Sequence, residues 1–243
     1  MRSDMKQRLD KMMLERRLVE SRSEAENWID LGQVMVNGSV VTRSGYFVDE
    51  TAEITLVNRE RYVSRAGLKL AGVADIFQLD FQGKTVLDIG SSTGGFTDFA
   101  LRHGARRVYA VDVGTNQLHR RLRNDQRIVL HEKTDIRDFE LDRSPDIIVG
   151  DVSFISLRDI LPHVAKRLMG SATVLVAMVK PQFEAGRHLV QKGVVKNATI
   201  RRKILADFEQ WAKQYFIILD KKDSTIAGSK GNVERFYKLQ LKN

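Results

Sequence analysis

The stretch that most constrains this chain is an apolar run of strand length that ends in a glycine-rich turn, VLDIGSSTGGFTD at residues 86–98. Residues 96–101 then read as the start of a helix, so the stretch predicts a strand, a tight turn and a helix. Such a unit opens a doubly wound α/β sheet, in which ligands bind beyond the carboxyl ends of the strands. Gly90, Gly94 and Gly95 let the backbone approach a ligand with no Cβ in the way. A tight turn that binds nothing is the alternative interpretation.

Two acids beside the turn favour a bound ligand. Asp88 precedes the first glycine inside the strand, and Asp112 closes the next apolar strand, residues 108–112. An acid at the end of the second strand is placed for the ribose hydroxyls of a nucleotide cofactor. The glycine spacing does not fit the G-x-G-x-x-G pattern of dinucleotide-binding proteins. The loop therefore resembles that of an S-adenosylmethionine-dependent methyltransferase more than that of an NAD enzyme.

Composition narrows the class of protein further. The chain has 243 residues, enough for one medium domain and a small one. It has no cysteine, and its five histidines lack ligand spacing, so we expect no disulfide and no metal site. No signal-peptide core opens the sequence, and the longest apolar run, residues 174–179, is far shorter than the ~20 residues of a membrane-spanning helix. We expect a soluble cytoplasmic protein with no membrane partner.

The charge of the chain indicates a polyanionic partner. The formal net charge is +9, and the first 60 residues are slightly acidic, so the positive excess belongs to the C-terminal part. Nucleic acid is the expected partner, and a merely solvated basic surface is the alternative. The basic residues suited to phosphates flank the second strand of the expected sheet; they are Arg102, Arg106, Arg107, Arg120, Arg121, Arg123 and Arg127.

Residues 1–59 are expected to form a separate, small α+β unit, followed by a linker over residues 60–64 and a larger domain over residues 65–243. Apolar residues at helical spacing predict two short helices, the second beginning at the capping-box motif of residues 21–24. The Asn37-Gly38 dipeptide between two short apolar runs predicts a β-hairpin.

This small unit resembles the S4 RNA-binding domain. The resemblance rests on RLDK at residues 8–11, SRSEA at residues 21–25 and the run from Gly32 through VNG at residues 36–38. It implies that the two helices and the hairpin present basic side chains to structured RNA, through shape and backbone contacts. For any one of these side chains a solvated helix face is the alternative. The expected RNA-binding residues are Arg8, Lys11, Arg16, Arg17, Arg22, Arg43 and Arg65.

The remaining apolar runs predict a doubly wound, Rossmann-like sheet that is mostly parallel. Residues 127–131, 146–151 and 173–179 are continuous apolar runs, as strands buried on both faces are. Of two C-terminal runs, residues 215–219 and 234–241, the second alternates in polarity, which predicts an antiparallel edge strand.

Two features beyond these strands have open interpretations. Asp135 lies just past a strand end, where the adenine of a bound cofactor would lie, and a helix cap or turn acid is the alternative. The loop over residues 185–197 is basic and punctuated by glycine. It is either a mobile substrate lid or a surface crossover.

Four charged residues fall at element ends that the sheet would bring to one rim: Lys69, Asp151, Lys180 and Glu234. A sulfonium methyl donor is already a strong electrophile, so the protein must align the acceptor and remove its proton. A ribose hydroxyl is a poor acid, and a lysine between a second cation and two carboxylates can be tuned toward the neutral amine that acts as a base. Two surface salt bridges are the alternative.

With their flanking residues these four positions closely resemble the TlyA (hemolysin A) family, which joins an S4 domain to an FtsJ-like ribosomal RNA methyltransferase. The matching segments are residues 62–69, 150–157, 179–184 and 231–234. The resemblance implies S-adenosylmethionine-dependent 2′-O-methylation of cytidine in 23S and/or 16S ribosomal RNA. By motif position Lys180 would be the central base, oriented and tuned by Lys69, Asp151 and Glu234. The cofactor-binding residues would be Asp88, Gly90, Ser91, Thr93, Gly94, Gly95, Phe96, Asp112 and Asp135.

Two other functions are alternatives to this enzyme. A non-catalytic factor that binds ribosomal subunits and keeps a cofactor pocket would retain its cellular function after Lys180→Ala. A membrane-lytic toxin, which the hemolysin label of the family suggests, is disfavoured because no segment looks pore-forming.

Overall fold

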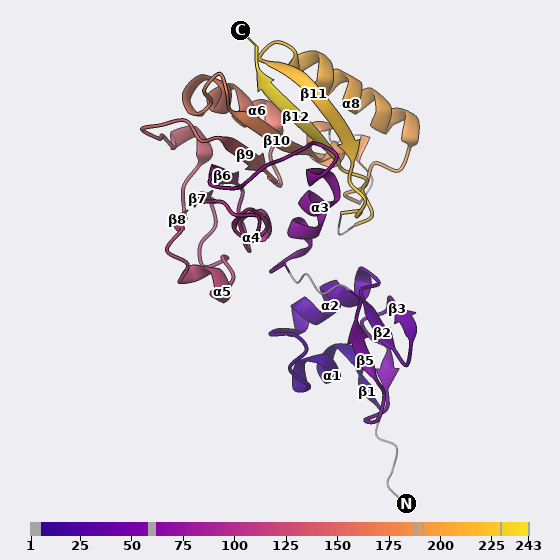
Figure 1. The fold of residues 1–243 in the computed structure, drawn as a ribbon. Helices are drawn as coiled ribbons and strands as arrows, with labels where there is room; N and C mark the ends of the chain where they lie inside the picture. The colour runs from indigo at the N-terminus through magenta and orange to yellow at the C-terminus, as the bar shows by residue number, and fades with distance from the viewer. Residues whose placement is uncertain (1–5, 58–61, 187–188, 191, 229, 243) are drawn as a thin grey trace, which may run out of the picture. The chain divides into compact units, whose positions relative to one another are not determined.

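In a computed structural model the chain divides into two compact units, residues 1–65 and 66–243 (Figure 1). The structure describes residues 6–57, 62–186, 189–190, 192–228 and 230–242. Parts of the expected linker (residues 60 and 61) and of the loop over residues 185–197 (residues 187, 188 and 191) therefore lie outside the described residues.

The N-terminal unit packs two helices against short antiparallel strands. Its apolar core is formed by one face of each helix, as helical spacing predicts, with Leu9 and Ile29 completely buried. Ser21 Oγ accepts a hydrogen bond from Glu24 N–H at 3.1 Å, which confirms the predicted helix cap. The elements are β1 (Gln7–Arg8), α1 (Leu9–Glu15), α2 (Arg22–Asp30), β2 (Val34–Val36), β3 (Ser39–Val41), β4 (Phe47–Val48) and β5 (Ile54–Leu56).

The predicted hairpin is also present. Strands β2 and β3 pair antiparallel with Val36 opposite Ser39, and β5 pairs with the other edge of β2. Asn37 and Gly38 have φ values of 49° and 79°. Because a two-residue hairpin turn requires positive φ at both central residues, the Asn-Gly sequence sets the register of this pair.

Over its described residues the C-terminal unit forms a seven-stranded sheet in the order β11-β12-β10-β9-β6-β7-β8. The strands from β10 to β8 in this order are parallel, β12 is antiparallel to β10, and β11 is antiparallel to β12. The strands are β6 (Thr85–Ile89), β7 (Arg107–Val111), β8 (Ile128–His131), β9 (Ile147–Gly150), β10 (Val174–Val179), β11 (Phe216–Asp223) and β12 (Arg235–Leu241). The strand order reverses between β6 and β9, and such a switch point opens a ligand crevice.

The predicted edge position of the last strand is wrong. Strand β12 lies between β10 and β11, and β11 is the edge. Alternation of polar and apolar residues reports that one face of a strand is partly solvated, but it does not decide whether both backbone edges are paired.

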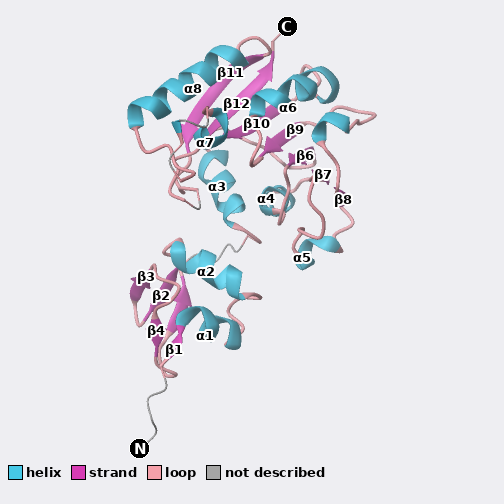
Figure 2. Ribbon diagram, turned by 180° about the vertical axis from the view of Figure 1, so that it is seen from behind, coloured by secondary structure: helices cyan, strands magenta, loops and turns pink. Residues whose placement is uncertain are grey.

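Helices cover both faces of the sheet (Figure 2). Leu87, Ile148 and Leu175 belong to a core that they share with α6 and α8. On the opposite face, Phe96 of α4 contacts Phe236 of β12, and Lys238 of β12 donates to Phe77 O, just past α3. The helices are α3 (Arg65–Ala74), α4 (Gly95–Arg102), α5 (Arg120–Arg123), η1 (Ile136–Asp138), α6 (Leu157–His163), η2 (Val164–Leu168), α7 (Pro181–Glu184) and α8 (Ala198–Ala212).

Candidate active site

The glycine-rich loop after β6 requires its glycines. Gly90 has a φ of 75°, and a Cβ on it would lie 2.9 Å from the carbonyl oxygen of Asp151. Gly94 has a φ of 90°, and a Cβ there would lie 2.5 Å from a methyl group of Leu122. A side chain at either position would therefore strain the backbone and push apart the loops beyond β6, β7 and β9.

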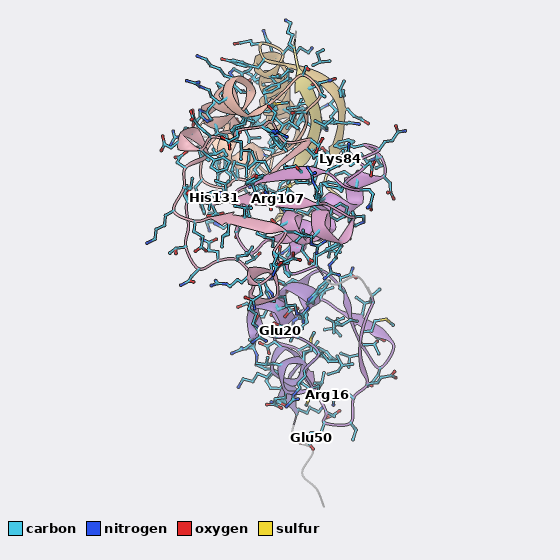
Figure 3. All side chains as sticks on the ribbon, turned by 60° about the vertical axis from the view of Figure 1, so that its left-hand side comes forward. Arg16, Glu20, Glu50, Lys84, Arg107 and His131 are labelled. Carbon is cyan, nitrogen blue, oxygen red and sulfur yellow. The ribbon has the colours of Figure 1, made fainter. Side chains whose placement is uncertain are left out.

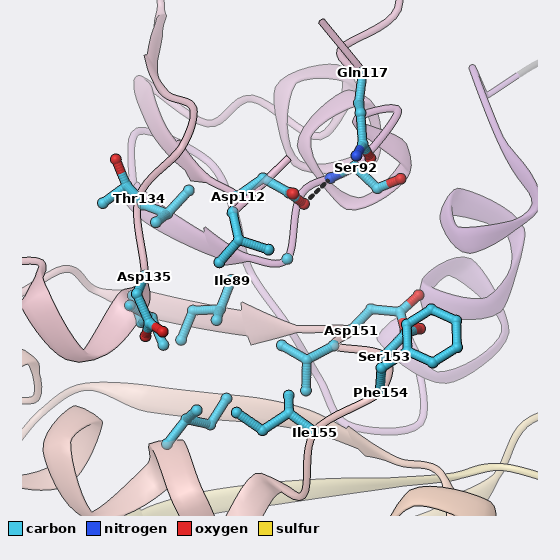
Figure 4. Close-up of a pocket in the computed structure, with 16 residues that line it drawn as sticks. Ile89, Ser92, Asp112, Gln117, Thr134, Asp135, Asp151, Ser153, Phe154 and Ile155 are labelled. Carbon is cyan, nitrogen blue, oxygen red and sulfur yellow. Dashed lines mark hydrogen bonds between the residues drawn. The ribbon is translucent and has the colours of Figure 1, made fainter. Parts of the chain in front are cut away.

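A cavity of about 330 Å³, here called the first cavity, lies beyond the carboxyl ends of β6, β7 and β9 (Figure 4). Apolar side chains form part of its wall, and two acids from different strand ends, Asp112 and Asp135, form another part. The apolar lining residues include Ile89, Val111, Ile136, Ile155 and Ile160. A cavity with apolar walls and a few placed polar groups is typical of a cofactor site.

Asp112 holds the loops around the first cavity. Its Oδ2 accepts a hydrogen bond from Ser92 N–H at 2.8 Å, drawn in Figure 4, and its Oδ1 accepts one from Gly114 N–H at 2.7 Å. Each carboxylate oxygen can accept a second hydrogen bond. The side chain thus fixes the glycine loop and still lines the cavity.

Asp135 also has two roles. Its Oδ1 accepts from Arg137 N–H at 2.9 Å, which caps the short helix η1, and its Oδ2 lies 2.6 Å from the Arg137 guanidinium. The hydrogen bonds from Arg137 hold the pKa of Asp135 below its usual range. The structure confirms the cap, and the same carboxylate lines the first cavity, while a position beside the adenine of a cofactor stays a prediction.

The remaining expected cofactor residues, apart from Gly90, do not line the first cavity. Asp88 is buried beneath the glycine loop, where its carboxylate accepts a hydrogen bond from Thr97 Oγ at 2.6 Å. Burial raises the pKa of Asp88 to about 7. Ser91 Oγ is buried with no hydrogen-bond partner among the described residues. The expected cofactor residues that are not part of the lining are Asp88, Ser91, Thr93, Gly94, Gly95 and Phe96.

The four expected catalytic residues form two ion pairs. Lys180 Nζ, just after β10, lies 2.6 Å from Asp151 Oδ1, just after β9, and donates to Ser153 Oγ at 2.7 Å. Lys69 Nζ of α3 lies 2.5 Å from Glu234 Oε2, just before β12. Both pairs are largely shielded from water, so they are not the surface salt bridges of the alternative interpretation.

A second cavity, of about 280 Å³, begins where the first ends. Lys180 and Glu234 line it, Asp151 lines the first cavity, and Ser153 and Phe154 line both. The Lys180–Asp151 pair therefore stands at the boundary between the two cavities. Further residues of the second cavity are Gln182, Phe183, Val190, Gly193, Lys230 and Asn232.

Phe154 is a feature of this boundary that sequence reasoning missed. Its side chain is 92% exposed, and its φ is 68°, which is unusual for a bulky residue. An exposed aromatic residue with strained backbone that lines a cavity is typical of a ligand contact. In the sequence Phe154 stands among alternating apolar residues and serines, VSFISL at residues 152–157, and no local signal there identifies it.

The expected RNA-binding residues of the N-terminal unit divide into two groups. Arg8 and Arg22 both bind the completely buried Asp10, at 3.0 and 2.7 Å. Arg16 donates to the backbone carbonyls of Ala52, at 2.6 Å, and of Glu50 (Figure 3). The other group, Lys11, Arg17 and Arg43, is exposed, and Arg65 is half-buried as the first residue of α3.

The arginines around the second strand of the sheet do not form one phosphate cradle. Arg107 begins β7, at the end of the sheet remote from the first cavity, close to Lys84 (Figure 3). Arg123 lies beyond the other end of this strand, where it donates to Leu118 O at 2.8 Å. Arg127 pairs with Asp125 at 2.7 Å. The expected cluster is thus spread over both ends of β7.

The chain is similar to known proteins over nearly its whole length. The family model of FtsJ-like methyltransferases matches residues 62–241, and that of the S4 domain matches residues 7–54. A protein named Hemolysin A from Brachyspira hyodysenteriae is 42% identical over 233 residues, which span 93% of this chain and 97% of that protein.

Two further relatives extend the comparison. A 16S/23S rRNA (cytidine-2′-O)-methyltransferase from Mycobacterium tuberculosis is 36% identical over 236 residues, 94% of this chain and 88% of that protein. A solved structure from Streptococcus thermophilus, of a protein named as a hemolysin, superposes with a TM-score of 0.75 at 38% identity and covers 99% of this chain and 90% of that one. Among the described residues no helix has the length and apolarity to cross a membrane, and no three potential metal-ligating side chains gather.

Proposed function

This chain belongs to the FtsJ-like methyltransferase family and carries an S4 domain, and we propose that it transfers a methyl group from S-adenosylmethionine to the 2′-hydroxyl of cytidine in ribosomal RNA. The observation that carries the proposal is the Lys180–Asp151 pair at the boundary of two adjoining cavities. A methyl donor in one cavity and an acceptor nucleotide in the other would meet at this pair. The names of relatives, which are rRNA (cytidine-2′-O)-methyltransferases, support the choice of cytidine as the nucleoside and of ribosomal RNA as the substrate.

The first cavity fits the proposed cofactor. When bound, S-adenosylmethionine supplies a methyl group on a positively charged, electrophilic sulfur. Asp112 has lone pairs for the ribose hydroxyls, and the isoleucine-rich wall suits the adenine ring. Gly90 leaves room where a Cβ would close the loop onto Asp151.

Lys180 is the proposed proton acceptor. Asp151 and Ser153 hold its Nζ from two sides, at 2.6 and 2.7 Å, so the amine has a fixed position at the edge of the second cavity. Lys180 would first lose the proton that it carries in its ion pair with Asp151, and the neutral amine would then take the proton of the ribose hydroxyl as that oxygen bonds to the methyl group. The buried Lys69–Glu234 pair would orient the acceptor from the other wall, because Glu234 lines the same cavity.

The second cavity suits a single nucleotide. Lys230 brings a positive charge to its lining, which favours a phosphate, and the exposed ring of Phe154 offers a surface on which a base can stack. The exposed basic side chains Lys11, Arg17 and Arg43 of the S4 domain would add contacts to the RNA backbone. The proposed partner is therefore ribosomal RNA, free or within a ribosomal subunit.

Methyl transfer from labelled S-adenosylmethionine to ribosomal subunits and to naked ribosomal RNA tests the proposal. Nucleoside mass spectrometry should detect 2′-O-methylcytidine with the wild-type protein. The Gly90→Val variant should give none, because its side chain would collide with Asp151 O and close the cofactor loop. No transfer to any RNA by a wild-type protein that binds the cofactor would support a non-catalytic binding factor instead. Label on a different nucleoside would contradict the assigned substrate.

A further inference from the structure

Glu184, the last residue of α7, is a buried carboxylate that the proposed chemistry does not use. Its side chain is 1% exposed. Its Oε2 accepts a hydrogen bond from Ser156 Oγ at 2.6 Å, and its Oε1 accepts one from Leu157 N–H at 2.8 Å. The Arg158 guanidinium lies 3.6 Å away. Burial raises the pKa of Glu184, so its position is costly for a charged group and is maintained by these contacts.

These contacts join the two segments that carry the proposed reactive groups. Helix α7 begins directly after Lys180, and the loop that ends at Ser156 begins with Asp151. Lys180 contacts Asp151 and Ser153 at one end of the two segments, and Glu184 contacts Ser156 and Leu157 at the other. Side chains thus link the segments at both ends.

Backbone hydrogen bonds between β9 and β10 do not link these two segments. The parallel ladder between β9 and β10 ends at the pair Gly150 and Ala177, before either segment begins. Beyond that pair, the segments are held together by the side-chain contacts of Lys180 and Glu184 and by a ring contact between Phe154 and Phe183, whose centroids lie 5.3 Å apart. A lysine has a long side chain with much rotamer freedom, so the position of its amine depends on how firmly its own backbone is held.

We propose that Glu184 is a positioning residue for methyl transfer. Hydrogen bonds to its carboxylate link α7 to the end of the loop of residues 151–156. This link keeps Lys180 Nζ between Asp151 and Ser153. The role rests on the proposed function of Lys180. Glu184 lines neither cavity, so it acts through Lys180 rather than on a bound molecule.

Two readouts test this role in the full-length protein. The first is the single-turnover rate of methyl transfer to ribosomal RNA with saturating S-adenosylmethionine. The second is the rate at which formaldehyde and a borane reductant methylate Lys180 Nζ, followed by peptide mass spectrometry, which needs no RNA. An amine held in an ion pair reacts slowly, and a released amine reacts faster.

Glu184→Ala should lower the single-turnover rate by about 10- to 100-fold, the scale of a small misplacement of a catalytic group, and should raise the labelling of Lys180. Glu184→Gln should remain within about threefold of wild type in both readouts, because its amide oxygen still accepts the Leu157 N–H bond and its amide nitrogen can donate to Ser156 Oγ. Glu209→Ala is the matched control. It removes a carboxylate that binds Tyr237 and Lys221 away from both cavities, and it should change neither readout.

Wild-type rate and labelling in Glu184→Ala would overturn the proposal, and so would a rate loss that merely follows the fraction of unfolded protein. If Glu184→Ala does not fold, Ser156→Ala removes one of the two hydrogen bonds and should shift both readouts in the same direction. A wild-type protein that methylates no RNA would reject the proposed function, and the labelling of Lys180 would still decide whether Glu184 positions it.

Discussion

Lys180 Nζ lies 2.6 Å from Asp151 Oδ1 at the point where the two cavities meet. The two residues follow adjacent parallel strands, so the sheet itself brings them together. Asp151 lines the first cavity and Lys180 the second. This pair is therefore the link between the proposed cofactor and the proposed nucleotide.

Gly228 leaves room for Glu234. A Cβ on Gly228 would lie 2.7 Å from Glu234 Oε1, so Gly228→Ala should move this carboxylate away from Lys69. We expect methyl transfer to fall about tenfold or more. Calorimetric titration with S-adenosylmethionine should give an unchanged affinity, since neither residue lines the first cavity. An unchanged transfer rate would show that the position of Glu234 is unimportant.

Phe154→Ala should lower kcat/KM for RNA and leave the stability of the fold nearly unchanged. A ring that is 92% exposed contributes little to stability, so the free energy of unfolding should stay within about 0.5 kcal/mol of wild type. Stacking of a base on an aromatic ring is worth about 1–3 kcal/mol, which predicts a loss in kcat/KM for RNA of about 5- to 100-fold. Ile217→Ala, at a half-exposed apolar residue on the edge strand β11, is the control. Equal kinetics for the two variants would argue against stacking.

Asp112→Asn should weaken cofactor binding. The carboxylate accepts hydrogen bonds from Ser92 N–H and Gly114 N–H, and an amide replaces one of its two acceptors by a donor. One lost hydrogen bond costs about 1 kcal/mol, so the Kd for S-adenosylmethionine should rise about fivefold or more. Asp220→Asn, on the edge strand, provides a comparison of equal charge. A Kd that stays at the wild-type value would remove Asp112 from the cofactor site.

Asp88 should make the stability of the C-terminal unit depend on pH. Its pKa is raised to about 7 in the folded chain, against about 3.9 in an unfolded one. The folded state therefore favours the neutral acid. The contribution of Asp88 to the free energy of unfolding is fully present below about pH 4 and is lost as the pH rises toward 7. The Tm of Asp88→Asn minus that of wild type should therefore increase as the pH rises from 5 to 8, because only the wild-type protein loses this stabilisation.

Asp80→Asn, at an exposed position in the same unit, should show no such trend when thermal unfolding is measured across this pH range. A constant difference between Asp88→Asn and wild type would mean that Asp88 does not titrate in the folded protein.

Local sequence signals predicted much of the fold. Ser21 with Glu24, the Asn37-Gly38 turn and the glycines after β6 each determine backbone conformation through their own chemistry, and each lies where the sequence indicates. The rim position of Asp151 and Lys180 also followed, because the ends of parallel strands meet at one edge of a sheet.

Features that depend on distant parts of the chain were not predictable in this way. Nothing in the residues around Phe154 shows that its ring is exposed, and the partners of Glu184 lie 27 and 28 positions away. The hydrogen bond from Thr97 to Asp88 beneath the loop was not predicted either, and the cofactor role of Asp88 stays a prediction. Which face a strand residue occupies depends on the register of the whole sheet.

The most direct test of the account is the single-turnover rate of methyl transfer to ribosomal RNA by Lys180→Ala, measured beside its affinity for S-adenosylmethionine. Lys203→Ala, at an exposed lysine of α8, is the control. We predict that Lys180→Ala lowers the rate by about 10²- to 10⁴-fold, the usual contribution of a general base, and keeps the Kd within about threefold. A rate near that of the control would contradict the role of Lys180, and a collapse of cofactor affinity would assign it to binding instead of proton transfer.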